Sequence, residues 1–164
     1  MCEKYLTLPG FDEEDEGCAE LKLILINQIS KLRGEGCTRF AVSMDCGVGL
    51  YAAEILHGLK GPDAALETIC HVPFEEQATK WTPELRDRYF NALAACIEVV
   101  NAAYEKTVGC EFKAYLEAMN EADTVIAVYD PDDPRCEREA AATAVAEMLN
   151  RQVITVDPKT IRLF

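Results

Sequence analysis

The sequence lacks the hydrophobic segments that insert a protein into a membrane or direct its export. No apolar run in its 164 residues approaches the ~18 residues that a bilayer span requires. Residues 1–10 lack the order of basic, apolar and small residues that is typical of a secretory signal. We therefore expect a cytoplasmic protein that has no membrane as a partner.

Closely spaced cysteine pairs are missing as well. The eight cysteines stand singly, with no C-x-x-C pair, so we expect neither a structural metal nor any other cofactor. Cys70 and Cys96 lie in apolar stretches, where a free cysteine behaves as a small hydrophobic residue. We predict that all eight are reduced thiols, although their even number leaves a disulfide framework open as the alternative.

Positive charge is scarce. Lys and Arg number 16 against 29 Asp and Glu, which gives a formal net charge of −13. Because nucleic acids and anionic lipid surfaces are bound mainly through Lys and Arg, we expect neither as a direct partner. The five consecutive acids at 12–16 are typical of a solvated stretch that leads into a helix, whose N-terminus favours negative charge.

What the sequence does contain is a regular alternation of two patterns. Short β-prone runs alternate with stretches of helical periodicity, which favours parallel strands with helices on both faces. The run at 124–129 is apolar enough to be buried on both faces of a sheet. We predict a single domain over residues 1–164, a Rossmann-like three-layer α/β/α fold with a mainly parallel sheet of five or six strands. The expected strands are 39–44, 66–72, 96–100, 124–129 and 152–156, and the expected helices are 19–33, 48–59, 83–95, 111–121 and 135–150.

Ligands of such folds bind beyond the carboxyl ends of the strands. The alternation places the loops 44–49, 73–77 and 130–134 there. Gly47 and Gly49 open a helix after a strand, so their backbone N–H groups could face a phosphate. The pair is shorter than a dinucleotide fingerprint, and a tight turn that needs glycine is the alternative.

Acidic residues gather at the same rim, at Asp45, Asp130, Asp132 and Asp133. A phosphate about 6 Å from one uncompensated carboxylate meets ~3 kcal/mol of repulsion at an effective dielectric of about 20. The favourable interaction of a phosphate with a helix N-terminus contributes only about 1 kcal/mol. The rim therefore disfavours a phosphate. A divalent cation bound by these aspartates would turn the repulsion of a phosphate into attraction. However, Asp-Pro turns are more typical of ordinary loops than of cation sites.

Several other residues near these loops allow two interpretations. Trp81 could stack a base or pack its loop on the sheet, and Gln77 could touch a ligand or hold the loop. Glu54 could face the pocket or pair on the surface. His71 could act as a general base, but no nucleophile or second base accompanies it. Ser43 has no His/Asp pattern around it.

Four ordered segments resemble one protein family. They are RFAVSMDCGVGLYAAE at 39–54, HVPFEEQATKW at 71–81, DTVIAVYD at 123–130 and QVITVD at 152–157. Pro73, Gln77 and Trp81 resemble the Pro–x–x–x–Gln–x–x–x–Trp signature of the YpsA-like family in the SLOG superfamily. These Rossmann-like proteins are related to the Lonely Guy phosphoribohydrolases. The resemblance implies the same fold and a dimer.

The departures from that family concern its anion-binding parts. Members usually open with a strand ending Thr-Gly-His-Arg, which this chain lacks. Ser43 and Gly49 occupy positions where the family has an extra glycine and an aspartate. Ala114 and Tyr115 replace the Arg-Asn pair of the family. The loop at 131–136 replaces a Gly-Gly-Thr phosphate loop. The resemblance therefore implies a binding fold with an eroded phosphate site.

These arguments lead to one prediction of function and two alternatives. We expect a non-catalytic ligand-binding or sensor protein of SLOG type, and not an enzyme, whose small-molecule ligand is nucleotide-derived. A nucleotide N-glycosidase and a protein-interaction subunit are the alternatives. We expect a homodimer and no catalytic residue. The predicted ligand-binding residues are Ser43, Asp45, Gly47, Gly49, Glu54, Gln77, Trp81 and Asp130.

Overall fold

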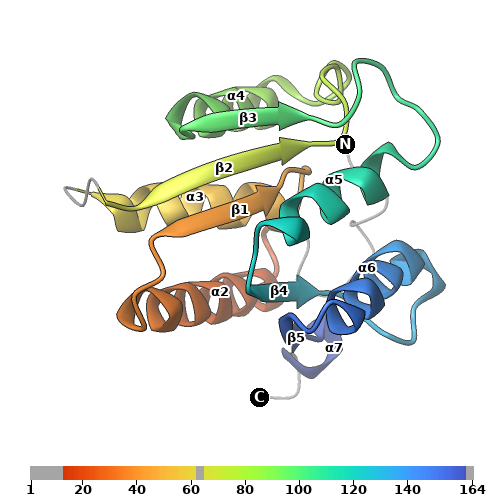
Figure 1. Ribbon diagram of the computed structural model, residues 1–164. Coiled ribbons are helices and arrows are strands. Elements are labelled where there is room, and N and C mark those ends of the chain that lie inside the picture. The colour runs from red at the N-terminus through yellow and green to blue at the C-terminus, as the bar shows by residue number, and fades with distance from the viewer. Residues whose placement is uncertain (1–12, 62–64, 162–164) are drawn as a thin grey trace.

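The computed structural model describes residues 13–61 and 65–161. Strands and helices alternate along this part of the chain, as the sequence predicted (Figure 1). The strands are β1 (Arg39–Ser43), β2 (Glu67–Val72), β3 (Glu98–Asn101), β4 (Thr124–Val128) and β5 (Gln152–Val156). The helices are α2 (Glu16–Gly34), α3 (Val48–Lys60), α4 (Pro83–Ala95), α5 (Cys110–Asn120), the 3-10 turn η1 (Pro134–Cys136), α6 (Glu137–Met148) and α7 (Pro158–Ile161).

Local capping explains where two helices begin. The carboxylate of Asp15 accepts the N–H of Gly17 at 2.9 Å, so the acidic run does start a helix. Thr82 caps α4 through its hydroxyl, and Pro83 follows in the first turn. None of the helices within 13–61 and 65–161 has the length and apolar character that a membrane crossing would need.

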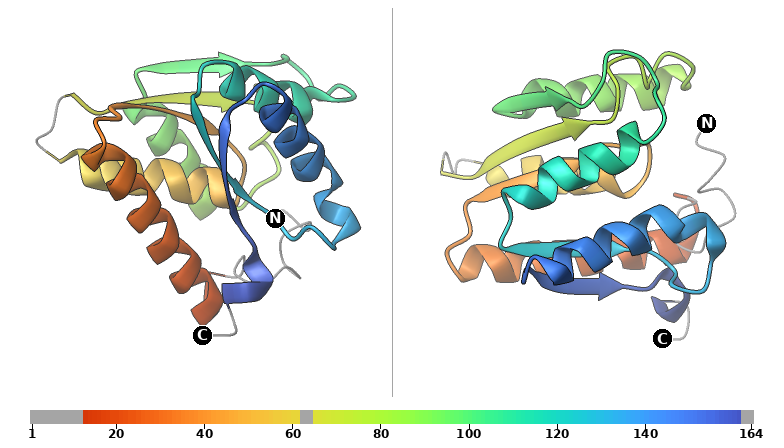
Figure 2. Two further views of the ribbon diagram at one scale, coloured as in Figure 1. Left: turned by 60° about the horizontal axis from the view of Figure 1, so that its bottom comes forward. Right: turned by 45° about the vertical axis from the view of Figure 1, so that its right-hand side comes forward.

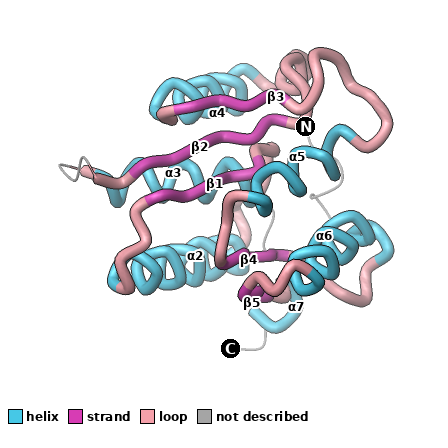
Figure 3. Tube along the Cα trace, in the orientation of Figure 1, coloured by secondary structure: helices cyan, strands magenta, loops and turns pink. Residues whose placement is uncertain are grey.

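In the part of the chain that the structure describes, all strand pairs are parallel, but they form two sheets and not one. The first sheet has the order β1-β2-β3, and the second consists of β4 and β5 (Figure 3). The fold class is confirmed, whereas the expectation of a sheet of five or six strands is wrong for the described residues. The strands themselves can be predicted from the sequence, but the composition of a strand does not determine which other strand pairs with its edge.

Helices cover both faces of the two sheets (Figures 1 and 2). On one side α3 and α4 pack against the first sheet, with Leu56 and Tyr89 in a core that includes Val72. On the same side α2 packs Leu25 near Val156 of β5. On the other side α5 contacts β1 and β2, and α6 contacts β4 and β5. The result is the three-layer arrangement that the alternation predicted.

The expectation of eight reduced thiols is also wrong. A disulfide joins Cys70 in β2 to Cys96, which immediately precedes β3, with the Cα atoms 6.3 Å apart. Cys46 is disulfide-bonded too, whereas Cys18, Cys37, Cys110 and Cys136 form no disulfide. Adjacent parallel strands bring Cys70 and Cys96 into the Cα range of a disulfide, and an apolar setting suits a disulfide as well as a thiol. Cys2 lies outside the described residues.

The apolar strand β4 is less buried than its sequence predicts. Each of its five residues is half-buried, although Ile126 contacts the cores on both sides of the molecule. The helices α2 and α6 cover its two faces, so the remaining exposure lies toward β1, in the plane of the sheet.

Candidate functional site

The carboxyl end of β1 passes into α3 through a tight junction. The side chain of Asp45 folds back over this junction, and its Oδ1 accepts the N–H of Gly47 at 2.8 Å and that of Gly49 at 3.0 Å. A carboxylate of the protein thus caps the N-terminus of α3. The two donors that the sequence offered to a phosphate are already bonded.

Gly49 is required because a side chain would not fit at this position, and not because the backbone conformation demands a glycine. A Cβ atom at Gly49 would lie 2.1 Å from the carbonyl oxygen of Ser43 and 3.1 Å from Cα of Met44. These are backbone atoms, which cannot turn aside. The glycine therefore lets the first turn of α3 lie directly on the end of β1.

Several polar residues line a cavity next to this junction. Ser43, Asp45 and Gly49 form part of the lining, together with Tyr115 of α5 and Glu139 of α6. The Tyr115 hydroxyl donates to Oε1 of Glu139 at 3.1 Å. Burial, with the nearby charges of Asp45 and Glu139, raises the pKa of Tyr115 well above its ordinary value. Tyr115 is therefore a hydrogen-bond donor at physiological pH and not a base.

Gln77 and Trp81 support the loop between β2 and α4. The side-chain amide of Gln77 donates to the carbonyl of Met44 at 3.2 Å and to the hydroxyl of Tyr89 at 3.1 Å. Trp81 packs edge-on against Tyr89, with ring centroids 5.0 Å apart. Both contacts hold the loop against the core, so packing accounts for the positions of both side chains.

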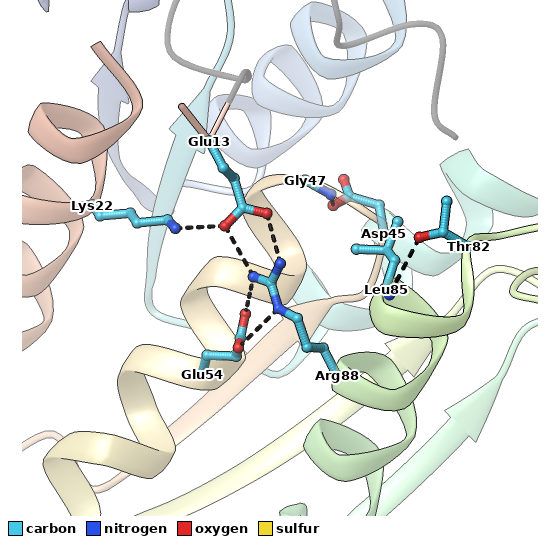
Figure 4. A network of polar contacts seen from close by, with 8 residues as sticks. All are labelled: Glu13, Lys22, Asp45, Gly47, Glu54, Thr82, Leu85 and Arg88. Carbon is cyan, nitrogen blue, oxygen red and sulfur yellow. Dashed lines mark hydrogen bonds and ion pairs between the residues drawn. The ribbon is translucent and has the colours of Figure 1, made fainter. Parts of the chain in front are cut away.

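Glu54 lies outside the cavity, in a charged network on α3 and α4 (Figure 4). Arg88 donates to Oε1 of Glu54 at 2.6 Å and to Oε1 of Glu13 at 2.6 Å, and Lys22 lies 2.8 Å from Glu13. Burial alone raises the pKa of Glu13, but the hydrogen bonds from Arg88 and Lys22 outweigh it and lower this pKa. The network fixes the start of the described chain beside α3.

The aspartates after β4 are compensated, contrary to the expectation of a repulsive rim. Asp130 is buried, accepts the N–H of Asp132 at 2.9 Å and pairs with Nζ of Lys159 at 2.9 Å. Hydrogen bonds from Arg135 lower the pKa of Asp133 to about 2. The repulsion expected from these residues is therefore largely cancelled by neighbouring cations.

Comparison with known proteins shows the family to which the chain belongs. The model of the YpsA family, described as the YspA SLOG family, matches residues 4–160. This chain belongs to the YpsA family. A UPF0398 protein of Halalkalibacterium halodurans is 29% identical over 143 residues, covering 80% of this chain and 75% of the relative. The UPF0398 protein YpsA of Bacillus subtilis is 25% identical over 133 residues, covering 79% of this chain and 73% of that relative.

This YpsA-family structure brings only part of the predicted site together. Ser43, Asp45 and Gly49 line one cavity, and Gly47 joins them through Asp45. The other four predicted residues are absent from the cavity lining and have partners elsewhere; they are Glu54, Gln77, Trp81 and Asp130. Within the described ranges no three His, Cys, Asp or Glu side chains are grouped so as to hold a metal ion.

Sequence reasoning missed two partnerships in this YpsA-family chain. Tyr115 and Glu139 are 24 residues apart, and only the packing of α5 beside α6 brings them together. Lys159 follows the last strand by three residues, and that position is the one available signal, because loops after parallel strands meet at one edge. His71 is buried in β2 outside the cavity lining, and burial lowers its pKa.

Proposed function

We propose that this protein binds a nucleotide-derived small molecule at the carboxyl end of β1, without cleaving it, as a ligand-binding or sensor protein. The observation that carries the proposal is the capping of α3 by Asp45. A phosphate placed there would have to displace a carboxylate and would meet its negative charge. The site therefore suits the uncharged nucleoside part of such a ligand.

The side chains around the junction support recognition of hydroxyl and amide groups. Tyr115, Glu139 and Ser43 line the same cavity, and their side chains carry two hydroxyls and a carboxylate. Ribose hydroxyls and base edges are donors and acceptors that such groups can bind with direction. A few polar groups in a mainly apolar pocket fix the orientation of a ligand in this way.

The same side chains do not support N-glycosidic cleavage. That reaction needs an acid or base whose pKa lies near the operating pH. The pKa of Tyr115 is raised far from that range, and Asp45 accepts two backbone N–H groups. The glycosidase alternative is tested by incubation with nucleoside monophosphates and assay for free base, where we expect no release above background.

Thermal shift with matched ligands tests the binding proposal. We expect nucleosides to raise the melting temperature more than their 5′-monophosphates, with and without Mg²⁺. A ligand at 100 times its dissociation constant adds about 2.7 kcal/mol to the free energy of unfolding. Tyr115→Phe should weaken nucleoside binding about five- to tenfold by removing one hydrogen bond. Asp45→Asn should reduce the discrimination against monophosphates.

Glu54→Gln is the matched control, because Glu54 is a carboxylate of α3 that does not line the cavity. It should leave the ligand ranking unchanged. Monophosphates that stabilise the wild type as well as nucleosides do would refute the proposed role of Asp45. A complete lack of stabilisation by the panel would favour the alternative of a protein-interaction subunit.

We also propose a cytoplasmic homodimer. Exposed apolar side chains on α4 and beside β3 support a protein contact, with Phe90 56% exposed and Ile97 51% exposed. Light scattering should give a mass near twice 18.2 kDa at micromolar concentration. A mass near 18.2 kDa throughout would exclude the dimer.

A further inference from the structure

The strand β3 is the outer strand of the first sheet. Among the described residues it pairs with β2 alone, so one of its two edges carries no ladder. Glu98, Val99 and Asn101 are exposed, and Val100 is half-buried. Figures 1 and 2 show β3 at the end of the first sheet that is remote from β4. This edge is therefore open to a partner strand.

The alternation of the backbone identifies the groups that face outward from β3. The N–H of Ala102, just after the strand, donates to the carbonyl of Val72 in β2 at 2.8 Å. In a parallel ladder, successive residues direct their backbone groups alternately toward the partner strand and away from it. The groups of Val100 therefore point toward β2, and those of Val99 and Asn101 point away. Each of these two residues presents one N–H and one C=O at the open edge.

Exposed apolar side chains accompany these backbone groups. Val99 lies on the α4 face of the sheet, because its register partner Cys70 belongs to the core that α3 and α4 cover. Its side chain is exposed, as are those of Phe90 in α4 and of Ile97 just before β3. On the other face α5 packs mainly on β1 and β2, so Val100 is only half-buried. Free backbone groups and exposed apolar surface thus occur at the same margin, which is typical of a protein contact.

We propose that β3 pairs antiparallel with β3 of a second copy, with Val100 on the two-fold axis, so that two three-stranded sheets become one. The inference names the contact of the homodimer proposed above and rests on that dimer. A two-fold axis normal to a sheet pairs a strand edge with itself in the antiparallel direction. One open edge on each copy is then sufficient, and the contact closes without exposing a further edge at the interface.

The residues of β3 select this register. With Val100 opposite its own copy, Val99 lies opposite Asn101, and every outward backbone group of these two residues gains a partner. Val100 then forms the closely spaced pair and contacts its copy. Glu98 lies opposite Ala102, so no carboxylate of β3 faces another. A register centred on Val99 would place Glu98 against Val100, and one centred on Glu98 would oppose two carboxylates.

Cysteine cross-linking of the full chain tests the register. In the closely spaced pair the Cα atoms lie about 4.5 Å apart, which is within the range of a disulfide. Val100→Cys should therefore give a disulfide-linked dimer in oxidised glutathione, with a mass near twice 18.2 kDa on a non-reducing gel. Glu98→Cys is the matched control on the same face. It should remain at the wild-type level, because the two copies of this residue lie about 14 Å apart along the strands. Equal cross-linking of the two variants would overturn the proposed register.

A proline at the open edge tests the pairing in solution. Asn101→Pro removes an outward N–H and no hydrogen bond to β2, whereas Asn101→Ala keeps that N–H. The two-fold axis doubles the loss, so Asn101→Pro should raise the dissociation constant of the dimer at least about tenfold. Asn101→Ala should change it less than about threefold. Equal dissociation constants for the two variants, measured by light scattering, would overturn the proposed pairing.

Amide exchange of the wild type needs no variant, so it decides the matter even if Asn101→Pro does not fold. Above the dissociation constant, the amides of Val99 and Asn101 should exchange at least about tenfold more slowly than below it. The amide of Val100 points toward β2 and should be protected at both concentrations. A dimer in which Val99 and Asn101 exchange at the rate of the monomer would overturn the β3 contact and leave the proposed homodimer intact. A monomer at every concentration would refute both.

Discussion

β2 and β4 are both short, apolar and parallel, but the protein buries them to different extents. Five of the six residues of β2 are buried, whereas all five residues of β4 are only half-buried. β2 has a hydrogen-bonded neighbour on each edge, and β4 has one on a single edge within the described chain. Helices cover the faces of both. The neighbours in the plane of the sheet therefore decide how fully an apolar strand is buried.

The largest expected effect compares these two strands by the same substitution. Val72→Asp in β2 should prevent folding, because an unpaired buried carboxylate costs several kcal/mol. Ile126→Asp in β4 should prevent folding as well, because Ile126 contacts the cores on both sides of the molecule. Circular dichroism and urea titration of both variants measure this, with Ile126→Val as a mild control that should cost about 1 kcal/mol. A soluble, cooperatively unfolding Ile126→Asp would show that the half-buried β4 keeps enough contact with water to hold a charge.

A smaller effect is expected at the junction of β1 and α3. Gly49→Ala should lower the free energy of unfolding by about 3 kcal/mol, because the added methyl meets the backbone of Ser43 and Met44. Gly58→Ala on the same helix is the control. No atom lies within 4 Å of a Cβ at Gly58, so this change should stabilise by about 0.5–1 kcal/mol through helix propensity. Equal denaturation midpoints for the two variants would contradict the close approach.

The first sheet should also make stability depend on pH. His71 is buried in β2, neither ring nitrogen has a hydrogen-bond partner in the described chain, and burial lowers its pKa from 6.5 despite the raising effect of Glu121, Glu117 and Glu98. Below pH 6.5 the unfolded state therefore binds a proton more readily than the folded state, and stability falls as the pH falls.

Urea titrations at pH 7.5, 6.5 and 5.5 measure that slope. His71→Leu should flatten it, although a part should remain because burial also lowers the pKa of His57. A variant with the wild-type slope would assign the pH dependence to other groups.

The smallest effect is expected in the surface network. Arg88→Met removes the cation between Glu13 and Glu54 and should cost about 0.5–1 kcal/mol, because the three side chains are about one-third exposed. The difference from wild type should shrink in 1 M salt. Arg86→Met, which removes one long bond to the carbonyl of Thr79, should change less. A loss that is insensitive to salt would indicate packing and not charge.

The sequence predicted local elements better than the relations between them. The strand at 124–129 and the helix that begins after Thr82 were found from composition and capping, which act over a few residues. The division into two sheets and the Cys70–Cys96 disulfide depend on which strands become neighbours. In the site, the loop after β1 was predicted by the strand-end rule.

The partners within that site were not predictable. Asp45 was expected to repel a phosphate from the rim, whereas it bonds the amides of Gly47 and Gly49. Arg88 and Glu13 are 75 residues apart, and their pairing follows from the packing of both α2 and α4 against α3. Composition gives the charge of a residue, but only the fold gives its counter-ion.

The carboxylate over the start of α3 acts as a tethered competitor. Asp45 is held four residues from Gly49, so its local concentration at these amides far exceeds the millimolar concentrations that short tethers commonly give. Any free anion must compete with it and pay for its own loss of motion on binding. Abundant cellular phosphates would thus be rejected by mass action at this position, with no lid or narrow entrance to keep them out.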